Sequence, residues 1–215
     1  MIIHDVSVTV SPSTVTWENS EIGLQIETLC TVGPDSPAHV SLFRLGAHTG
    51  THLDAPMHFI AGGAPLEQLD LQAVVGPAAV VEITGVPTID ASALASAKIK
   101  PGTTRLIIKT DNTARGLVFD SKFHPDYVGV APDGAQWLVD HGIILIGLDY
   151  LSVGAYGEQN IETHRILLGN SVVLVEALNL TDVSPGDYFL AALPPKFAGT
   201  EASPCRVVLI EGISL

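Results

Sequence analysis

Three histidines and one aspartate lie within the eleven-residue run His48-Thr-Gly-Thr-His-Leu-Asp-Ala-Pro-Met-His58. When thiolates are absent, imidazole and carboxylate groups are ligands that suit Zn²⁺, Mn²⁺ and similar divalent ions. Catalytic sites of this kind keep one coordination position open for water or substrate, whereas closed structural zinc sites are built largely from cysteine. The run therefore predicts a hydrolytic metal site.

The conformation of this run decides whether its polar groups can meet. The spacing of His48 and His52 would suit one face of a helix, but an intervening glycine, two β-branched threonines and a nearby proline disfavour a helix. In an extended chain, alternate residues point to the same side. The four polar residues all have even numbers, so we expect them to share one side, with only Gly50 and Pro56 between them.

A second candidate ligand lies far downstream, at the end of the apolar run Val172–Glu176. Such a run predicts a strand that is buried on both faces, and an unpaired buried carboxylate is strongly destabilising. Glu176 therefore needs a cation, a metal ion or a hydrogen-bond network. His164 is its predicted companion, because it lies on the helix expected just before this strand.

The elements that position these residues can be read from the pattern of apolar runs and turn residues. The predicted strands are Ile2–Val8, Leu24–Cys30, Val40–Leu45, Ala78–Ile83, Arg105–Lys109, Ile143–Leu148, Val172–Glu176, Tyr188–Ala192 and Arg206–Ile210. The predicted helices are Ala91–Lys98 capped by Asp90, Gly134–His141 started by Asp133, and Ile161–Leu168 capped by Asn160. This mixture predicts an α/β fold with a mixed sheet, in which Leu24–Cys30 and Val40–Leu45 are half-exposed antiparallel strands. With no evident linker, residues 1–215 are expected to form one domain.

Composition limits the partners. The formal net charge is −13 with only 10 lysines and arginines, which counts against nucleic acid or an anionic membrane surface. Hydrophobic residues make up 47% of the chain and charged residues 15%, so we expect a second copy to cover part of the surface, as in a homodimer or homotetramer. Neither a membrane-spanning run nor a signal peptide is evident, which predicts a cytoplasmic enzyme with a small-molecule substrate. Cys30 and Cys205 are predicted to be buried, unpaired thiols.

The block from His48 to Phe59, followed by His164 and Glu176, resembles the cyclase family of metal-dependent hydrolases. That family includes bacterial kynurenine formamidases and isatin hydrolases. Further segments that carry the resemblance are Trp17, Trp137–Val139, Gly147–Val153, Val183–Tyr188 and Leu193–Lys196. The resemblance implies a swivelling β/β/α fold and a centre with two divalent ions, Zn²⁺ or Mn²⁺.

The resemblance also implies a role for each candidate residue. The ligands would be His48, His52 and Asp54 for the first ion, and Asp54, Glu176 and His164 for the second. His58 would be the catalytic acid and base rather than a ligand, and Trp17 would line the substrate pocket. Asp149 receives no role, since it could orient a ligating histidine or cap the next turn.

This chemistry predicts hydrolysis of an amide by a metal-activated water. The leading substrate is N-formylkynurenine, cleaved to kynurenine and formate, and the alternative is a cyclic amide or imide such as isatin. A non-catalytic metal-binding protein is a weaker alternative. A further alternative is an Fe(II) oxygenase, whose single ion would need only two histidines and one carboxylate. Glu176 and His164 count against this class, because they predict a second ion site.

Overall fold

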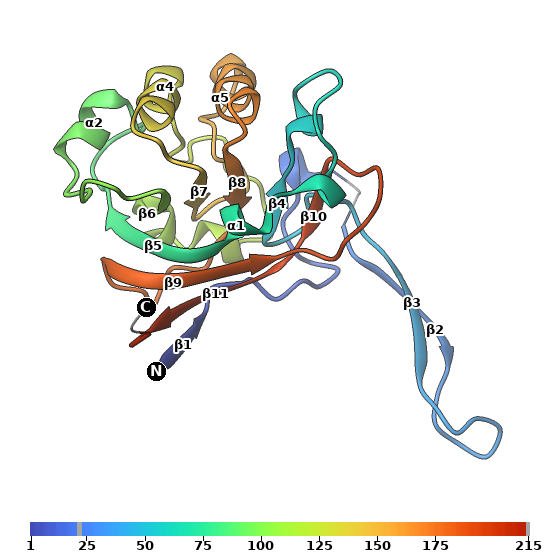
Figure 1. The fold of residues 1–215 in the computed structure, drawn as a ribbon. Coiled ribbons are helices and arrows are strands. Elements are labelled where there is room, and N and C mark those ends of the chain that lie inside the picture. Colours follow the sequence, from blue (N-terminus) through green and yellow to red (C-terminus); the bar gives the residue numbers. More distant parts are fainter. Residues whose placement is uncertain (21–22, 214–215) are drawn as a thin grey trace.

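A mixed sheet of nine strands forms the centre of the computed structural model, which describes residues 1–20 and 23–213 (Figure 1). Its spatial order is β1 (Ile2–Asp5), β11 (Arg206–Glu211), β9 (Gly186–Leu193), β5 (Val75–Glu82), β6 (Arg105–Lys109), β7 (Leu145–Leu148), β8 (Val173–Glu176), β4 (His52–Asp54) and β10 (Ala202–Pro204). Strands β5 to β8 run parallel, and their outer neighbours are antiparallel. The predicted mixed α/β architecture is confirmed.

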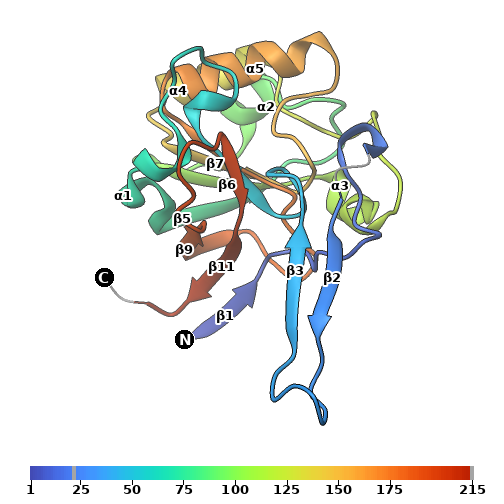
Figure 2. The same cartoon turned by 90° about the vertical axis from the view of Figure 1, so that its right-hand side faces the viewer.

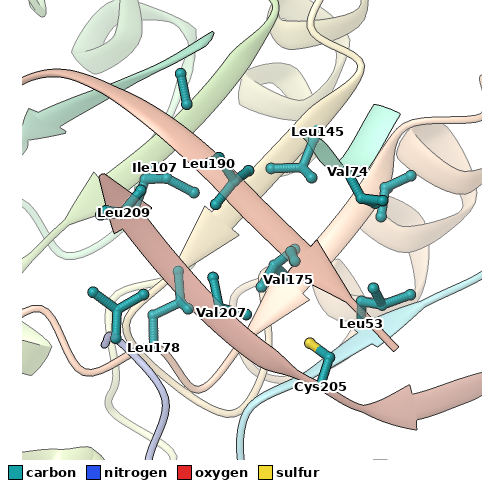
Figure 3. Packing of buried hydrophobic residues seen from close by; sticks show 14 of the residues in the cluster. Leu53, Val74, Ile107, Leu145, Val175, Leu178, Leu190, Cys205, Val207 and Leu209 are labelled. Atoms are coloured by element: carbon teal, nitrogen blue, oxygen red, sulfur yellow. The ribbon is translucent and has the colours of Figure 1, made fainter. Parts of the chain in front are cut away.

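The parallel strands are buried on both faces. One face packs under three helices (Figure 1), namely α2 (Ala91–Ser96), α4 (Pro132–Asp140) and α5 (Glu158–Gly169). The other face packs against the curled strands β9 and β11, where Ile107, Leu145 and Val175 meet Leu190 and Leu209 (Figure 3). Strands covered on both faces need apolar residues at successive positions, which explains why these runs do not alternate with polar residues.

Short helices and a separate pair of strands complete the fold. The short helices are α1 (Leu71–Val74), α3 (Asp111–Ala114) and the 3₁₀ turns Trp17–Asn19, Pro56–His58, Leu66–Gln68 and Leu117–Phe119. The two remaining strands, β2 (Gln25–Cys30) and β3 (Val40–Arg44), form an antiparallel hairpin that projects from the main body (Figures 1 and 2). The prediction that these strands are half-exposed is wrong, because all their residues except Cys30 are exposed.

The other predicted elements are all present, with boundary shifts. Asp90 caps α2 by accepting a hydrogen bond from the Ala93 amide, as predicted. Asp133 does not start its helix, because α4 begins at Pro132, whose ring favours the first helical position. Asn160 is not a cap either, since α5 begins at Glu158 and leaves Asn160 inside its first turn. Strand β10 was not predicted, because Ala202–Pro204 is too short to give an apolar pattern.

The state of the two cysteines and the length of the helices can be checked against the sequence predictions. Cys30 and Cys205 are unpaired in the described chain; Cys205 is buried as predicted, but Cys30 is only half-buried. Among the described residues, no helix combines the length and apolarity that crossing a bilayer requires.

Candidate metal centre

The run from His48 to His58 is extended only at its centre. Strand β4 covers His52–Asp54, and a 3₁₀ turn follows at Pro56–His58. Gly50 has a φ of 68°, and a Cβ atom on it would lie 2.4 Å from Val10 Cγ2. The expectation of one continuous strip is therefore wrong: Gly50 reverses the chain against Val10 instead of leaving space for an ion, and Pro56 begins a helical turn.

Within β4, however, the alternation holds. Leu53 points into the core beside Val175 (Figure 3), so its neighbours His52 and Asp54 face the opposite side. Strand β4 pairs with β8 in an antiparallel register that places His52 directly opposite Glu176. Directly opposed residues share a sheet face, which brings His52 Nε2 to 3.2 Å from Glu176 Oε2.

Helix α5 supplies the next side chain. Its buried residues recur at helical spacing, so one face lies against the sheet: Asn160, Thr163, His164, Leu167 and Leu168. This face places His164 Nε2 at 3.4 Å from Glu176 Oε1 and 3.9 Å from Asp54 Oδ2. The predicted pairing of His164 with Glu176 is thus present in the structure.

The two turns flanking β4 bring the remaining histidines to the same carboxylate. His48 Nδ1 lies 3.1 Å from Asp54 Oδ1, and His58 Nε2 lies 3.9 Å from Asp54 Oδ2. The imidazole rings of His48 and His58 are 4.2 Å apart between centroids. Both rings are partly exposed, whereas His52 and Asp54 are completely buried, so the cluster opens to solvent on the side of His48 and His58.

The buried end of this cluster has unsatisfied polar atoms. Among the described residues, His52 Nε2 and both carboxylate oxygens of Asp54 are buried without a hydrogen-bond partner. Buried polar atoms are almost always paired, so three unpaired atoms gathered in one place are typical of a site that binds a ligand. Their types, one imidazole nitrogen and two carboxylate oxygens, fit a divalent metal ion.

The charges of the cluster give the same indication. Burial alone would lower the pKa of His48, but the carboxylates of Asp54, Glu176 and Glu201 outweigh it and raise that pKa to about 9. Burial would raise the pKa of Glu176, yet His164 and His52 hold it well below its usual range. A buried carboxylate pair thus draws positive charge from its surroundings, and a divalent cation would supply that charge directly.

Main-chain hydrogen bonds fix the orientation of the candidate ligand side chains. The Nδ1 atom of His52 lies 2.8 Å from the Gly50 carbonyl oxygen, and that of His164 lies 2.7 Å from the Asn160 carbonyl oxygen. With Nδ1–H donating to these carbonyls, the Nε2 atom of each ring is the one that faces the cluster, and on losing its proton it could bind a metal ion, as in metal-ligating histidines. Glu176 Oε1 in turn accepts a hydrogen bond of 2.7 Å from the Val153 amide.

Several supporting residues were missed by sequence analysis. The Asn160 side-chain amide donates to Ser152 Oγ at 2.7 Å and to the Gly154 carbonyl at 3.0 Å. These bonds fasten the loop whose Val153 amide holds Glu176. Glu201, on the loop before β10, lies 3.4 Å from His48 Nε2. Neither Asn160 nor Glu201 belongs to a recognisable spacing, so only the tertiary structure identifies them.

Thr51 links β4 and β8, the two strands that carry candidate ligands. Its buried hydroxyl donates to the Ala177 carbonyl at 2.7 Å and accepts from the Val8 amide at 2.9 Å. Ala177 follows Glu176 directly and has a left-handed φ of 56°, which is unfavourable for a residue with a Cβ atom. Thr51 therefore helps to hold the backbone bend that ends β8 at Glu176.

We expect the Thr51→Val substitution to destabilise the protein and to weaken metal binding. Valine has nearly the same shape but leaves the Ala177 carbonyl and the Val8 amide unpaired, at a cost of about 1–3 kcal/mol for each group that stays buried. Urea unfolding of the metal-free protein and titration with Zn²⁺ measure the two effects. Thr51→Ser keeps the hydroxyl and is the matched control. If valine lowered stability with unchanged Zn²⁺ affinity, Thr51 would have no positioning role.

Trp17 lies in an aromatic cluster that packs into the same group of apolar residues as Ala177, the residue after Glu176. Its ring centroid is 4.8 Å from that of Phe123, 5.8 Å from Tyr156 and 6.4 Å from Tyr127. The Tyr127 hydroxyl donates to the Gly154 carbonyl, and burial, together with the negative charge of Glu176, raises the pKa of Tyr127. The cluster is therefore connected to the loop that holds Glu176, and a role of Trp17 in substrate binding stays a prediction.

Asp149 is a structural anchor. Its carboxylate accepts hydrogen bonds from the amides and hydroxyls of Thr110 and Thr113, and from the Asn112 side chain. None of these partners is a candidate metal ligand. These contacts therefore show neither of the two roles left open by the sequence: Asp149 fastens the turn at the start of α3, where Thr110 lies 39 residues earlier in the chain.

The model of the cyclase family, described as a putative cyclase, matches residues 4–155. Cyclase-like protein 3 of Arabidopsis thaliana is 40% identical over 216 residues, which cover 97% of this chain and 79% of that protein. The resemblance found in the sequence is confirmed by these matches.

Solved structures give the same assignment. A potential metal-dependent hydrolase with cyclase activity is 32% identical, with a TM-score of 0.84 over 97% of this chain and 96% of that one. Isatin hydrolase A from Ralstonia solanacearum shares the fold at 23% identity, with a TM-score of 0.78 over 98% of this chain and 92% of its own. With candidate ligands for a divalent metal gathered at one site, the chain belongs to the cyclase family.

Proposed function

We propose that this chain is a metal-dependent hydrolase that cleaves an amide bond with water. The observation that carries the proposal is the group of orphaned, fully buried atoms on His52 and Asp54, which lie beside a second buried carboxylate on Glu176. Burying such a group without a cation would destabilise the folded protein, whereas a bound cation would offset its negative charge. The metal-dependent hydrolase among the similar solved structures supports the same reaction class.

Two ions per chain, Zn²⁺ or alternatively Mn²⁺, are part of this proposal. The side chains form two groups of ligand atoms that share Asp54: one with His48 and His58, and one with His52 and Glu176. A carboxylate common to both groups supports the proposal that Asp54 would contribute to both ion sites. We propose that His48 and His52 would complete the first site and that Glu176 and His164 would complete the second, which leaves His58 free of an ion. When bound, the ions would activate water, polarise the carbonyl and stabilise the developing negative charge.

His58 is the proposed acid and base. Its ring lies beside His48 on the open side of the cluster, with 27% of the side chain exposed, so a substrate can reach it. In this role His58 accepts the proton that the attacking water loses, and then donates it to the leaving amine nitrogen. The carbonyl carbon gains a hydroxyl group and loses the amine, which gives a carboxylic acid and a free amine.

N-formylkynurenine is the proposed substrate, which would make the chain an arylformamidase that releases kynurenine and formate. The aromatic cluster of Trp17, Phe123 and Tyr156 supports a flat aromatic substrate, since rings stack and pack edge-on with one another. A cyclic amide such as isatin is the alternative, supported by the fold shared with isatin hydrolase A. Both reactions would use the same groups of the site.

The two substrates can be compared in one experiment. The protein is loaded with Zn²⁺ or Mn²⁺ and incubated separately with N-formylkynurenine and isatin, and the absorbance of each is followed. We expect faster hydrolysis of N-formylkynurenine than of isatin. A preference for isatin would replace the arylformamidase proposal with the alternative. Metal binding without turnover of either would contradict both substrates and would favour a non-catalytic metal-binding protein.

The partners, location and oligomeric state of the enzyme are proposed from the composition of the chain. We expect a small-molecule substrate, no nucleic-acid or membrane partner, a cytoplasmic location and a homodimer or homotetramer. The strongly acidic chain, with a net charge of −13, supports the exclusion of polyanionic partners.

A further inference from the structure

The loop between β7 and α5 carries the main-chain group that orients Glu176. The amide of Val153, in this loop, donates a hydrogen bond of 2.7 Å to Glu176 Oε1. The same oxygen lies 3.4 Å from His164 Nε2, whereas Oε2 lies 3.2 Å from His52 Nε2. A glutamate side chain can rotate about several bonds, so this amide selects which carboxylate oxygen faces which histidine. The contacts that hold Val153 in place therefore also orient Glu176.

Asn160 bonds to both neighbours of Val153. Its side-chain amide donates to Ser152 Oγ at 2.7 Å and to the Gly154 carbonyl at 3.0 Å. Asn160 and Ser152 are buried, and hydrogen bonds that are shielded from water are electrostatically stronger than exposed ones. Gly154 makes the close approach possible, because a Cβ atom there would lie 3.0 Å from the Cα atom of Asn160. The loop and the first turn of α5 are thus joined directly through one side chain.

The main chain of Asn160 orients a second candidate ligand. Its carbonyl oxygen lies 2.7 Å from Nδ1 of His164, which is four residues further along α5. Residues four apart lie on the same side of a helix, so the buried face that carries His164 also carries Asn160. One residue therefore contacts the supports of both Glu176 and His164, two of the three proposed ligands of the second ion.

Tyr127 is a further support of the same loop. Its buried hydroxyl donates to the Gly154 carbonyl, the acceptor that Asn160 also uses, and lies 3.3 Å from the amide nitrogen of Asn160. The main chain of Val130 bonds to the loop on both sides of Gly154. These main-chain bonds hold the path of the backbone, so the loop can keep its fold when one of the two side chains is changed.

We propose that Asn160 and Tyr127 are positioning residues that hold the ligands of the second ion in place. Both act through the loop whose Val153 amide binds Glu176, and Asn160 acts also through its carbonyl on His164. Neither side chain binds the ion itself. The inference rests on the proposed metal centre, since the positions of Glu176 and His164 matter in this way only if they bind an ion.

The test uses variants that remove one polar group at a time. Tyr127→Phe keeps the ring and loses the hydroxyl, whereas Asn160→Leu keeps a side chain of similar size and loses the amide. The double variant Tyr127→Phe/Asn160→Leu frees the Gly154 carbonyl from both side chains. Tyr150→Phe is the matched control: Tyr150 is buried and packs against Tyr127 with ring centroids 4.7 Å apart, but its hydroxyl accepts from the His124 amide.

Two measurements are made at a temperature at which circular dichroism shows each variant to be folded. The affinity for each Zn²⁺ ion is measured by competition with a chelator, and exchange of the Val153 amide is followed by NMR in the metal-free protein. We expect the double variant to bind one Zn²⁺ ion about 10–100-fold more weakly, as is usual when outer partners of metal ligands are lost, with smaller losses in the single variants. The Val153 amide should exchange faster in these variants, and Tyr150→Phe should change neither quantity.

The possible results separate this inference from the proposed function. If the unmodified protein binds Zn²⁺ and the double variant binds it equally tightly, the positioning role is refuted while the metal centre stands. An unchanged exchange rate of the Val153 amide would also refute it. Equal weakening by Tyr150→Phe would reduce the effect to a general loss of stability and overturn the inference. If the unmodified protein binds neither Zn²⁺ nor Mn²⁺, the proposed function fails and this inference fails with it.

Discussion

Replacing Asp54 with asparagine is expected to remove bound metal and, with it, hydrolytic activity. Asp54 is completely buried and lies within 4 Å of four histidines, so its carboxylate is the common centre of the cluster. Asparagine keeps the shape but removes the negative charge and one ligand oxygen. Loss of an outer partner of a ligand typically weakens metal binding about 10–100-fold, and loss of the central ligand should exceed that.

The measurement is the number of metal ions per chain after dialysis, together with turnover of the preferred substrate. Glu201→Gln is the control, because Glu201 also approaches His48, at 3.4 Å, but its side chain is 40% exposed. We expect this control to retain its metal and most of its activity. An Asp54→Asn protein with a full metal content would contradict the proposed bridging role.

Replacing His58 with alanine is expected to separate metal binding from catalysis. If His58 transfers protons and does not bind an ion, the variant keeps its metal content while turnover falls about 100–10,000-fold. Its position makes this test necessary, because His58 lies at 3.9 Å from Asp54 and beside His48, close enough to act as a ligand instead. His124→Ala is the control, since His124 pairs with Asp120 on the surface, outside the cluster.

The metal content and the rate together decide the role of His58. Loss of one ion together with the rate would make His58 a ligand. Full activity with both ions would leave it without a catalytic role. A low rate with unchanged metal content is the result that the acid and base role requires.

The sequence predicts those features of the site that depend on neighbouring residues better than those that depend on contacts between distant segments. The residue types between His48 and His58 indicate metal binding directly, and alternation correctly puts His52 and Asp54 on one side of a strand. Alternation fails beyond that strand because Gly50 and Pro56 bend the chain on either side. The four polar groups still meet, but through two turns rather than along one strip.

For contacts between distant segments, the sequence predicts that a residue needs a partner but not where that partner lies. A carboxylate at the end of an apolar strand requires a partner, so Glu176 could be predicted as a ligand before its neighbours were known. Its actual position depends on the register between β4 and β8, which no local pattern specifies. Thr51 and Asn160 could not be predicted, because their hydrogen bonds join distant segments and polar residues of these types are common on surfaces.

The projecting hairpin of β2 and β3 illustrates a different limit. Alternating apolar and polar residues predict a strand, and the strands at Gln25–Cys30 and Val40–Arg44 were found almost as predicted. The same pattern does not specify which surface covers the strand. The expectation of one buried face assumed packing within the chain, whereas both faces are exposed here.

Anomalous diffraction from crystals of the metal-loaded protein tests the central claim most directly. Data collected on both sides of the zinc or manganese absorption edge locate each ion without any assumption about substrate. We predict peaks beside Asp54, with His52 Nε2 and a Glu176 oxygen at about 2.0–2.3 Å from an ion. Strong peaks only elsewhere on the chain, or none at this cluster in crystals that contain stoichiometric metal, would contradict the proposed metal centre.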